Sequence, residues 1–292
     1  MDLAYERAGH GAPLVLLHAL GADRRSWMPV IPYLTATFDV VTIDLPGFGQ
    51  SPQLGTEPTP KALARAVAAF LDAHHIDAPH LAGNSLGGWV ALELAAIRPA
   101  ASIALLSPAG LWPGRTPWYC RTSVATTRWL TEHWGRPLSA MMRFRAGRAL
   151  VLGQTHGHPG RTTPEYARAA IEAMGTCSGF RATFDATLSR RYTAGPVRAP
   201  VTIAFGSRDR LILKPWRSLD ELPPGTRSMP LAGCGHLPMA DDPVAVAGII
   251  NASARSIAGT GITARLDANE PVEQSGPPRP SPQSTNATVP LA

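Results

Sequence analysis

The most constraining feature of this 292-residue chain is a stretch that reads as a short strand, a tight turn and a helix, residues 79–96. Its turn holds Gly83-x-Ser85-x-Gly87, which places a serine where the chain reverses direction. A turn this sharp strains the serine backbone, and flanking glycines let strand and helix pass closely. The helix starting at Leu86 then directs free N–H groups and its positive dipole end toward the serine. The motif alone could be a Gly-rich turn that contains a serine by chance. Its position between a strand and a helix predicts instead that the serine is a nucleophile exposed at the turn.

Composition places the chain among soluble globular proteins. It has 45% apolar and 16% charged residues, and its length suffices for one large or two small domains. The net charge of +6 comes almost entirely from arginine, since Lys61 and Lys214 are the only lysines. The arginines are scattered and form no basic arm or recognised motif, so we expect no nucleic-acid partner.

The cysteines, Cys120, Cys177 and Cys234, are odd in number and far apart in the sequence. This pattern argues against a disulfide framework and predicts a reducing compartment, the cytoplasm. No apolar run approaches the length that crosses a bilayer, and the first residues do not resemble a signal peptide. We therefore expect no membrane partner.

Predicted strands and helices alternate along most of the chain. Apolar runs such as Pro13–Leu17 are typical of strands buried on both faces. Strands are predicted over 3–7, 13–17, 38–43, 79–82, 102–106, 200–205 and 226–231. Helices are predicted over 26–34, 59–74, 86–97 and 241–256. Pro29 and Pro32 would shorten or break the first of these helices. The alternation predicts an α/β fold, with a mostly parallel central sheet and helices on both faces.

The alternation stops in an inserted helical unit over 111–196, where no buried strand is apparent. Helices are predicted there over 116–134, 138–152, 164–174 and 179–192. The insertion separates two parts of an α/β core, 1–110 and 197–257. The tail over 258–292 is rich in Pro, Ser, Thr and Asn, and it cannot bury enough apolar surface to offset its ordering entropy. We predict that this tail is disordered.

The chain resembles the α/β-hydrolase family over roughly residues 1–256. The turn Gly83–Gly88 matches that family's nucleophile elbow, and Asp44–Gly49 resembles its D-x-P-G-x-G loop. Asp209 follows the first strand after the insertion, where the family places its acid. His236 lies in a Gly-rich loop after the last strand, as the family's histidine does. The order Ser, Asp, His is also the family's order.

The resemblance implies a catalytic triad of Ser85, Asp209 and His236, with a helical cap over 111–196. It also implies an oxyanion hole formed by the backbone N–H groups of Leu86 and Leu20. Two features depart from the family pattern. The common His-Gly is His18-Ala19 here, and the N-terminal hairpin is reduced to one short strand, so an edge strand is missing or shortened.

Other residues could take the same roles. Asp44, at another strand end, is the alternative acid. Cys234 lies two residues before His236 but has no elbow, which favours a packing role. His156-x-His158 lies in a Gly/Pro loop with no clear third ligand, so we expect no metal site and no cofactor.

These residues predict a serine hydrolase that cleaves a carboxylic ester or similar acyl bond through an acyl-enzyme intermediate. Alternatives on the same fold are a meta-cleavage C–C bond hydrolase, a lactonase, a peptidase and a cofactor-free haloperoxidase. A non-catalytic small-molecule-binding member is the alternative from a different class. The sequence does not distinguish the oligomeric state.

The inserted unit is expected to set substrate preference. Its four tryptophans could line an apolar pocket or pack within the unit: Trp112, Trp118, Trp129 and Trp134. Arg145 and Arg148 share one helical face, which is either an outer surface or a roof over Ser85. The sequence therefore predicts a medium-sized, largely apolar ester-type substrate, with tolerance for one acidic group if those arginines face the site.

Overall fold

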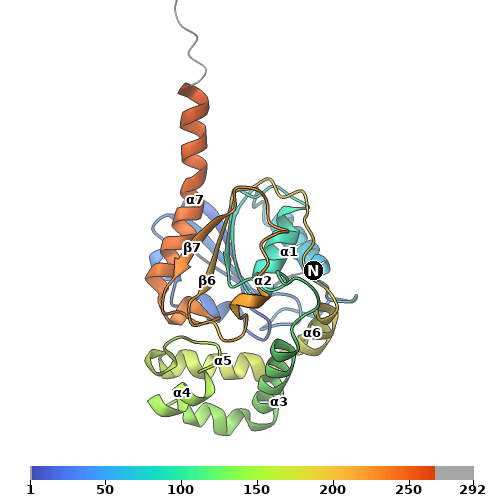
Figure 1. The fold of residues 1–292 in the computed structure, drawn as a ribbon, viewed down its shortest axis with the longest axis vertical. Helices are drawn as coiled ribbons and strands as arrows, with labels where there is room; N and C mark the ends of the chain where they lie inside the picture. Colours follow the sequence, from blue (N-terminus) through green and yellow to red (C-terminus); the bar gives the residue numbers. More distant parts are fainter. Residues whose placement is uncertain (1, 267–292) are drawn as a thin grey trace, which may run out of the picture. The chain divides into compact units, whose positions relative to one another are not determined.

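The computed structural model describes residues 2–266, and they contain a seven-stranded sheet of order β1-β3-β2-β4-β5-β6-β7 (Figure 1). The strands are β1 Tyr5–Gly9, β2 Ala12–Leu17, β3 Phe38–Ile43, β4 His80–Asn84, β5 Ser102–Leu106, β6 Val201–Gly206 and β7 Arg227–Leu231. Strand β1 pairs antiparallel with β3, and every other pair in the sheet is parallel. The predicted α/β fold is confirmed, and the N-terminal part of the described chain supplies one edge strand.

The sheet is buried on both faces because successive side chains point to opposite sides. In β2, Val15 and Leu17 belong to one apolar cluster while Leu14 and Leu16 belong to another. Helices α1 (Pro60–Ala73) and α2 (Leu86–Ala95) complete the first cluster. Helix α7 (Pro243–Leu266) completes the second, and Figure 1 shows it across the sheet from α1 and α2.

Local sequence explains where these helices begin. The Thr59 side chain caps α1 by accepting the N–H of Ala62, and Pro60 occupies its first turn, where no N–H is needed. Over 26–34 the predicted helix is replaced by two short 3-10 helices, Arg24–Trp27 and Ile31–Tyr33. Pro29 and Pro32 remove the N–H groups that a longer helix would require.

The inserted segment, residues 111–196, is called the cap segment below. Its helices are α3 Trp118–Met141, α4 Arg145–Val151, α5 Pro164–Thr176 and α6 Phe180–Leu188. The first two predicted boundaries are wrong, because α3 continues past Gly135 and Pro137 with a kink at Trp134. Pro137 has no N–H to donate within the helix, and it lies just after this kink, where the regular hydrogen bonding is interrupted. The chain up to Ile257 forms one compact unit that includes these helices.

The C-terminal boundary also differs from the prediction. Helix α7 runs to Leu266, beyond the predicted end near 256, because residues 257–266 contain no proline to stop it. The rest of the predicted disordered tail, 267–292, lies outside the described residues. Within residues 2–266 no helix is long and apolar enough to span a membrane.

Candidate active site

The turn between β4 and α2 holds Ser85 in a strained backbone conformation. Its φ is 52° and its ψ is −113°, a backbone conformation that residues other than glycine rarely adopt. A Cβ on Gly83 would overlap the backbone of Gly87, and one on Gly87 would overlap the carbonyl of Leu17. The two glycines therefore let β4 and α2 approach closely. This close approach makes the turn sharp and places Ser85 at its tip.

His236 and Asp209 form a buried pair at the ends of β7 and β6. The His236 Nδ1–H donates to Asp209 Oδ2 at 3.0 Å. The other carboxylate oxygen of Asp209 accepts the N–H groups of Leu211 and Ile212, both at 2.9 Å. Burial opposes ionisation of Asp209, but His236 and these N–H donors outweigh it and hold the pKa of the carboxyl below its usual value. An ionised Asp209 fixes the His236 tautomer and leaves Nε2 free to take a proton.

Ser85 and His236 meet in a pocket of about 100 Å³, called the inner pocket below. Leu20 and Leu86 also line it, together with Trp112. The fold thus gathers all the predicted site residues: four line the inner pocket, and Asp209 lies directly behind His236.

The two predicted oxyanion donors differ in how they are held. Leu86 is the first residue of α2, so its N–H has no acceptor one turn earlier in the helix. Leu20 lies in the loop after β2, which the buried His18 ring organises. His18 Nδ1–H donates to the Ala19 carbonyl at 2.8 Å, and Nε2 accepts the Leu45 N–H at 2.9 Å. Burial lowers the pKa of His18, which keeps this bridging ring neutral.

The His18-Ala19 departure is accommodated without strain at Ala19. Positive φ in this loop falls on Gly21, at 74°, and Ala19 is not among the described non-glycine residues that have positive φ. An alanine therefore fits where the family pattern has glycine.

The alternative acid, Asp44, has other partners. Its buried carboxylate accepts the Arg24 N–H at 2.7 Å and the Gln50 N–H at 2.9 Å. It also forms an ion pair with the Arg24 guanidinium. Asp44 closes a loop beside the site and makes no contact with His236.

The remaining alternatives carry no reactive chemistry. Burial raises the pKa of Cys234 to about 12, so its thiol stays protonated at neutral pH and acts in packing. The His156 Nδ1 pairs with the Thr155 hydroxyl at 3.0 Å, whereas His158 lies beside Arg208. Among residues 2–266 no group of histidines, cysteines and carboxylates could hold a metal ion.

Two supporting residues were missed by the sequence. Asn84, directly before Ser85, donates its Nδ2–H groups to the carbonyls of Leu106 at 2.9 Å and His236 at 3.0 Å. Asp241 accepts three backbone N–H groups: Gly157 at 2.7 Å, His158 at 2.8 Å and Gly235 at 2.8 Å. The sequence Asp241-Asp242-Pro243 predicted only the start of a helix. The partners of Asp241 lie in loops distant in sequence, so its role could not be predicted.

We expect Asp241→Asn to lower kcat/KM by about tenfold, because an amide has one acceptor oxygen and leaves at least one of the three N–H donors without an acceptor. The attachment between the loop that carries His236 and the cap segment would then be weaker, although the Leu237 N–H would still donate to the Thr155 carbonyl. Steady-state kinetics on a short ester measures the effect. Asp242→Asn is the matched control, because its carboxylate only caps α7 through the Ala245 N–H. Equal losses in both variants would contradict a positioning role for Asp241.

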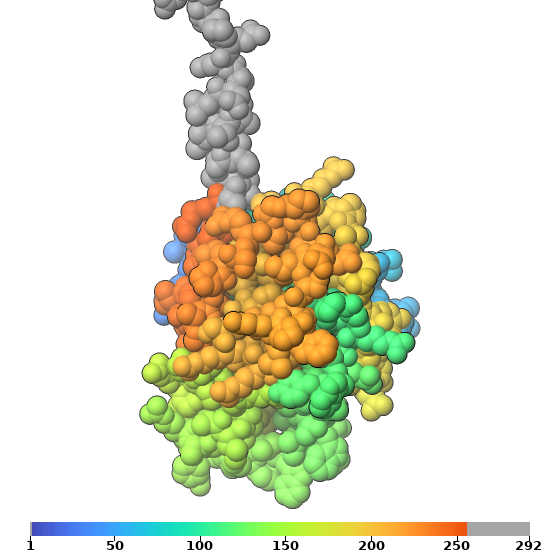
Figure 2. All heavy atoms as spheres, in the orientation of Figure 1, coloured from blue at the N-terminus to red at the C-terminus, as the bar shows by residue number. Residues whose placement is uncertain are grey.

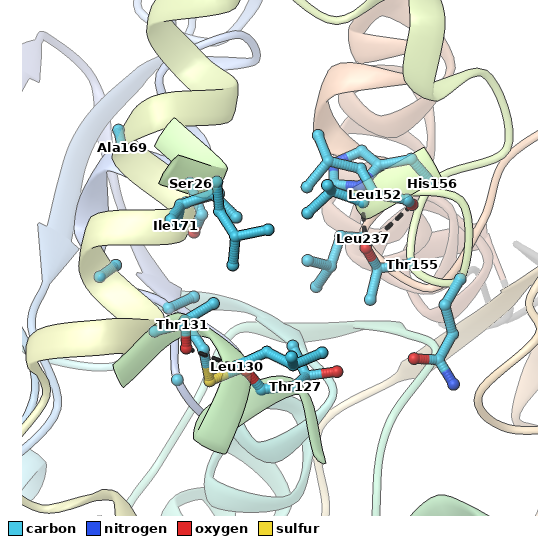
Figure 3. A pocket seen from close by; sticks show the side chains of 18 of the residues that line it. Ser26, Thr127, Leu130, Thr131, Leu152, Thr155, His156, Ala169, Ile171 and Leu237 are labelled. Atoms are coloured by element: carbon cyan, nitrogen blue, oxygen red, sulfur yellow. Dashed lines mark hydrogen bonds between the residues drawn. The ribbon is translucent and has the colours of Figure 1, made fainter. Parts of the chain in front are cut away.

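A second, larger space lies beneath the cap segment. This cap cavity has a volume of about 750 Å³ and lies between α3, α5 and the loop from Leu152 to His156 (Figure 3). The residues that line both spaces are Leu20, Thr127, Gln154, Thr155, Met174 and Leu237. The cap cavity and the inner pocket are therefore neighbours, and the wall between them is mostly side chains.

Most of the tryptophans and arginines of the cap segment that were candidates for the site line neither space. Of its four tryptophans only Trp112 lines the inner pocket, where it packs edge-on against Trp89. Arg145 is exposed, and the Arg148 guanidinium donates to the carbonyls of Met142, Arg143 and Gly160. Neither arginine lines either space, so the predicted clamp for an acidic group is wrong.

Comparison with known proteins gives consistent matches. The profile of the Alpha/beta hydrolase family matches residues 14–249. Over 258 residues the chain is 30% identical to a pimeloyl-[acyl-carrier protein] methyl ester esterase of Aeromonas hydrophila, covering 83% of this chain and 95% of that protein.

Two solved structures share the arrangement. One is a membrane phospholipase A, described as a bacterial virulence factor, with a TM-score of 0.67, 26% identity, and coverage of 88% of this chain and 83% of that one. The other is a thermophilic esterase from Thermogutta terrifontis, with a TM-score of 0.66, 21% identity, and coverage of 87% and 93%. The second likeness is one of fold alone.

Proposed function

The chain belongs to the alpha/beta hydrolase family, and from that premise we propose that it is a serine esterase working through an acyl-enzyme intermediate. One observation carries the proposal: a strained serine and a carboxylate-bound histidine line the same pocket. A histidine that served only in packing would need neither a serine in the same pocket nor an ionised carboxylate bound to its other side.

The roles follow from the geometry. Ser85 Oγ attacks the ester carbonyl while His236 Nε2 accepts its proton, and Asp209 stabilises the imidazolium that forms. The N–H groups of Leu86 and Leu20 stabilise the negative charge on the carbonyl oxygen. His236 then returns the proton to the departing alcohol, and a water molecule activated by the same ring releases the acid. The three free cysteines are in keeping with the reducing cytoplasm predicted from the sequence.

The two spaces suggest where the acyl part and the alcohol part of an ester would bind. We assign the acyl chain to the cap cavity and a small alcohol, such as methanol, to the inner pocket, because the first is much the larger. The cap cavity is lined mainly by Leu, Met, Ile, Val, Ala and Thr, which suits a medium to long, largely apolar acyl chain. The methyl ester esterase relative acts on an ester of the same kind.

A panel of methyl esters with increasing acyl length tests this assignment. We expect kcat/KM to rise with chain length as the cap cavity fills, and acetates of long alcohols to be poor substrates. Ala170→Trp should fill part of the cap cavity and abolish the preference for long acyl chains, while leaving the short ester almost unaffected.

Ala69→Trp is the matched control, because Ala69 is exposed on α1, remote from both spaces. A preference for long alcohols over long acyl chains would reverse the assignment. Faster turnover of lactones or of vinylogous diketone acids than of any ester would overturn the esterase proposal itself.

A further inference from the structure

The outer part of the cap segment exposes an unusual set of apolar side chains. Between residues 129 and 150 the exposed fractions are 52% for Trp129, 54% for Trp134, 55% for Phe144 and 75% for Leu150, with Leu130 at 40%. These five side chains, with Arg136, Arg143 and Arg145, are called the distal cap surface below. Soluble proteins rarely gather large apolar side chains in this way unless the surface binds something.

The distal cap surface lies away from the sheet. Figure 1 places α3 and α4 at the end of the compact unit opposite the sheet, and Figure 2 shows this end formed by the green and yellow-green residues. Other exposed apolar side chains are spread over separate elements: Trp118 at the start of α3, Ile97 after α2 and Val244 in α7.

The same surface is strongly basic. Residues 129–150 contain four arginines and a single acidic residue, Glu132, which pairs with Arg128 at 3.3 Å. Among the described residues, the exposed Arg136, Arg143 and Arg145 form no ion pair with a carboxylate. The Arg143 guanidinium lies 4.4 Å from the centre of the Phe144 ring, so a positive charge and an apolar ring are in direct contact on this surface. The partner that suits this combination is both anionic and apolar.

The cap cavity opens on this surface. Leu130 and Leu150 both line the cap cavity and are both exposed to solvent, so they stand at its mouth. Leu130 comes from α3 and Leu150 from α4, which makes the mouth a gap between these two helices. An apolar molecule that entered there from a lipid phase would reach the cap cavity without crossing water.

We propose that the distal cap surface adsorbs to anionic lipid bilayers. Tryptophan and phenylalanine rings favour the depth of the lipid headgroups, and arginines at the same level attract anionic phosphates. This differs from the expectation of no membrane partner, which rested on the absence of a spanning segment. Composition and hydropathy cannot show that apolar side chains face outward. The adsorption itself needs no catalysis, and only the entry route rests on the proposed esterase function.

Co-sedimentation with vesicles tests the proposal on the full-length chain carrying Ser85→Ala, which prevents any turnover. We expect binding to phosphatidylglycerol-rich vesicles, little binding to pure phosphatidylcholine vesicles, and weaker binding at high salt. Trp129→Ser with Trp134→Ser should reduce the partition coefficient by about tenfold or more. Each of Arg136→Gln, Arg143→Gln and Arg145→Gln should reduce it about fivefold at low salt.

Matched controls come from the core. Ile97→Ser, Val244→Ser and Arg65→Gln remove exposed side chains of the same kinds elsewhere, and they should leave partitioning unchanged. In the otherwise wild-type chain, the tryptophan and arginine variants should keep full activity on a water-soluble short ester, which shows that they fold.

Two outcomes overturn the proposal. One is vesicle binding that the distal variants and the core controls reduce equally. The other is an absence of binding to phosphatidylglycerol-rich vesicles. If a soluble acidic protein were then captured through the same three arginines, this would be a protein-docking surface. Neither outcome affects the esterase proposal, which is tested on soluble esters.

Discussion

Ser85→Ala is expected to lower kcat by at least about 10⁴-fold, because it removes the hydroxyl that would form the acyl-enzyme. The thiol of Cys120 also lines the inner pocket, but burial raises its pKa to about 12, so it stays protonated. Circular dichroism and the melting temperature should show an intact fold, since the hydroxyl contributes no described hydrogen bond. Labelling the wild-type chain with an organophosphonate and mapping the adduct by mass spectrometry should find Ser85 alone. An active alanine variant, or an adduct on another serine, would refute the mechanism.

Ser85→Gly provides an internal check on the strained turn. At a φ of 52°, glycine avoids a cost that alanine retains, so the glycine variant should be more stable than the alanine variant by about 1 kcal/mol. Both variants should be equally inactive. Equal stability would mean that the elbow is not strained in solution.

Asp209→Asn is expected to lower kcat about 10³- to 10⁴-fold while leaving the fold in place. An amide at this position cannot stabilise the imidazolium, and it can hold the His236 ring in the wrong tautomer. Asp44→Asn is the matched control, because Asp44 is equally buried but binds Arg24. It should reduce stability and leave kcat on a short ester within about tenfold. The opposite ranking of the two variants would return Asp44 to consideration as the acid.

The Asp209 substitution also has a stability signature that depends on pH. The folded-state pKa of Asp209 lies below its unfolded value, so its carboxylate stabilises the fold at pH values above that unfolded value. This contribution is lost as the pH falls through the lower, folded-state pKa. The stability difference between wild type and Asp209→Asn should therefore be full at neutral pH and shrink in strong acid. Urea unfolding at several pH values measures it, and a difference that grows on acidification would contradict the assignment.

Local patterns in the sequence were enough to predict the core. Apolar runs of strand length and capped helices alternate, and each depends mainly on neighbouring residues, so β2 to β7 and α1, α2 and α7 lie close to their predicted places. The elbow was visible for the same reason. The conformation of Ser85 is set by Gly83, Gly87 and the strand and helix on either side, all within one short stretch. Pro29 and Pro32 likewise indicated that the helix predicted over 26–34 would be short or broken, and two 3-10 helices take its place.

Contacts between distant residues could not be read in the same way. Both Asp209 and Asp44 follow buried strands, and only the strand order decides which carboxylate reaches His236. Asp241 joins two loops that are about 80 residues apart in sequence, since it accepts N–H groups near Gly157 and Gly235, and no periodicity encodes such a contact.

The orientation of the cap segment was decided by packing as well. Its helices were predictable from composition, but which face of each helix lies inward depends on the helices and loops packed against it. That packing turns Trp129 and Trp134 outward, binds Arg148 to backbone carbonyls, and leaves the cap cavity to smaller apolar side chains. The sequence by itself therefore determined the fold class and predicted Ser85 as the nucleophile, because these depend on short-range patterns. The resemblance had already named Asp209 as the acid, and the tertiary structure supplied the contact that joins it to His236. Only the tertiary structure decided the shape of the cap cavity and the exposure of the distal cap surface, because these depend on which distant surfaces meet.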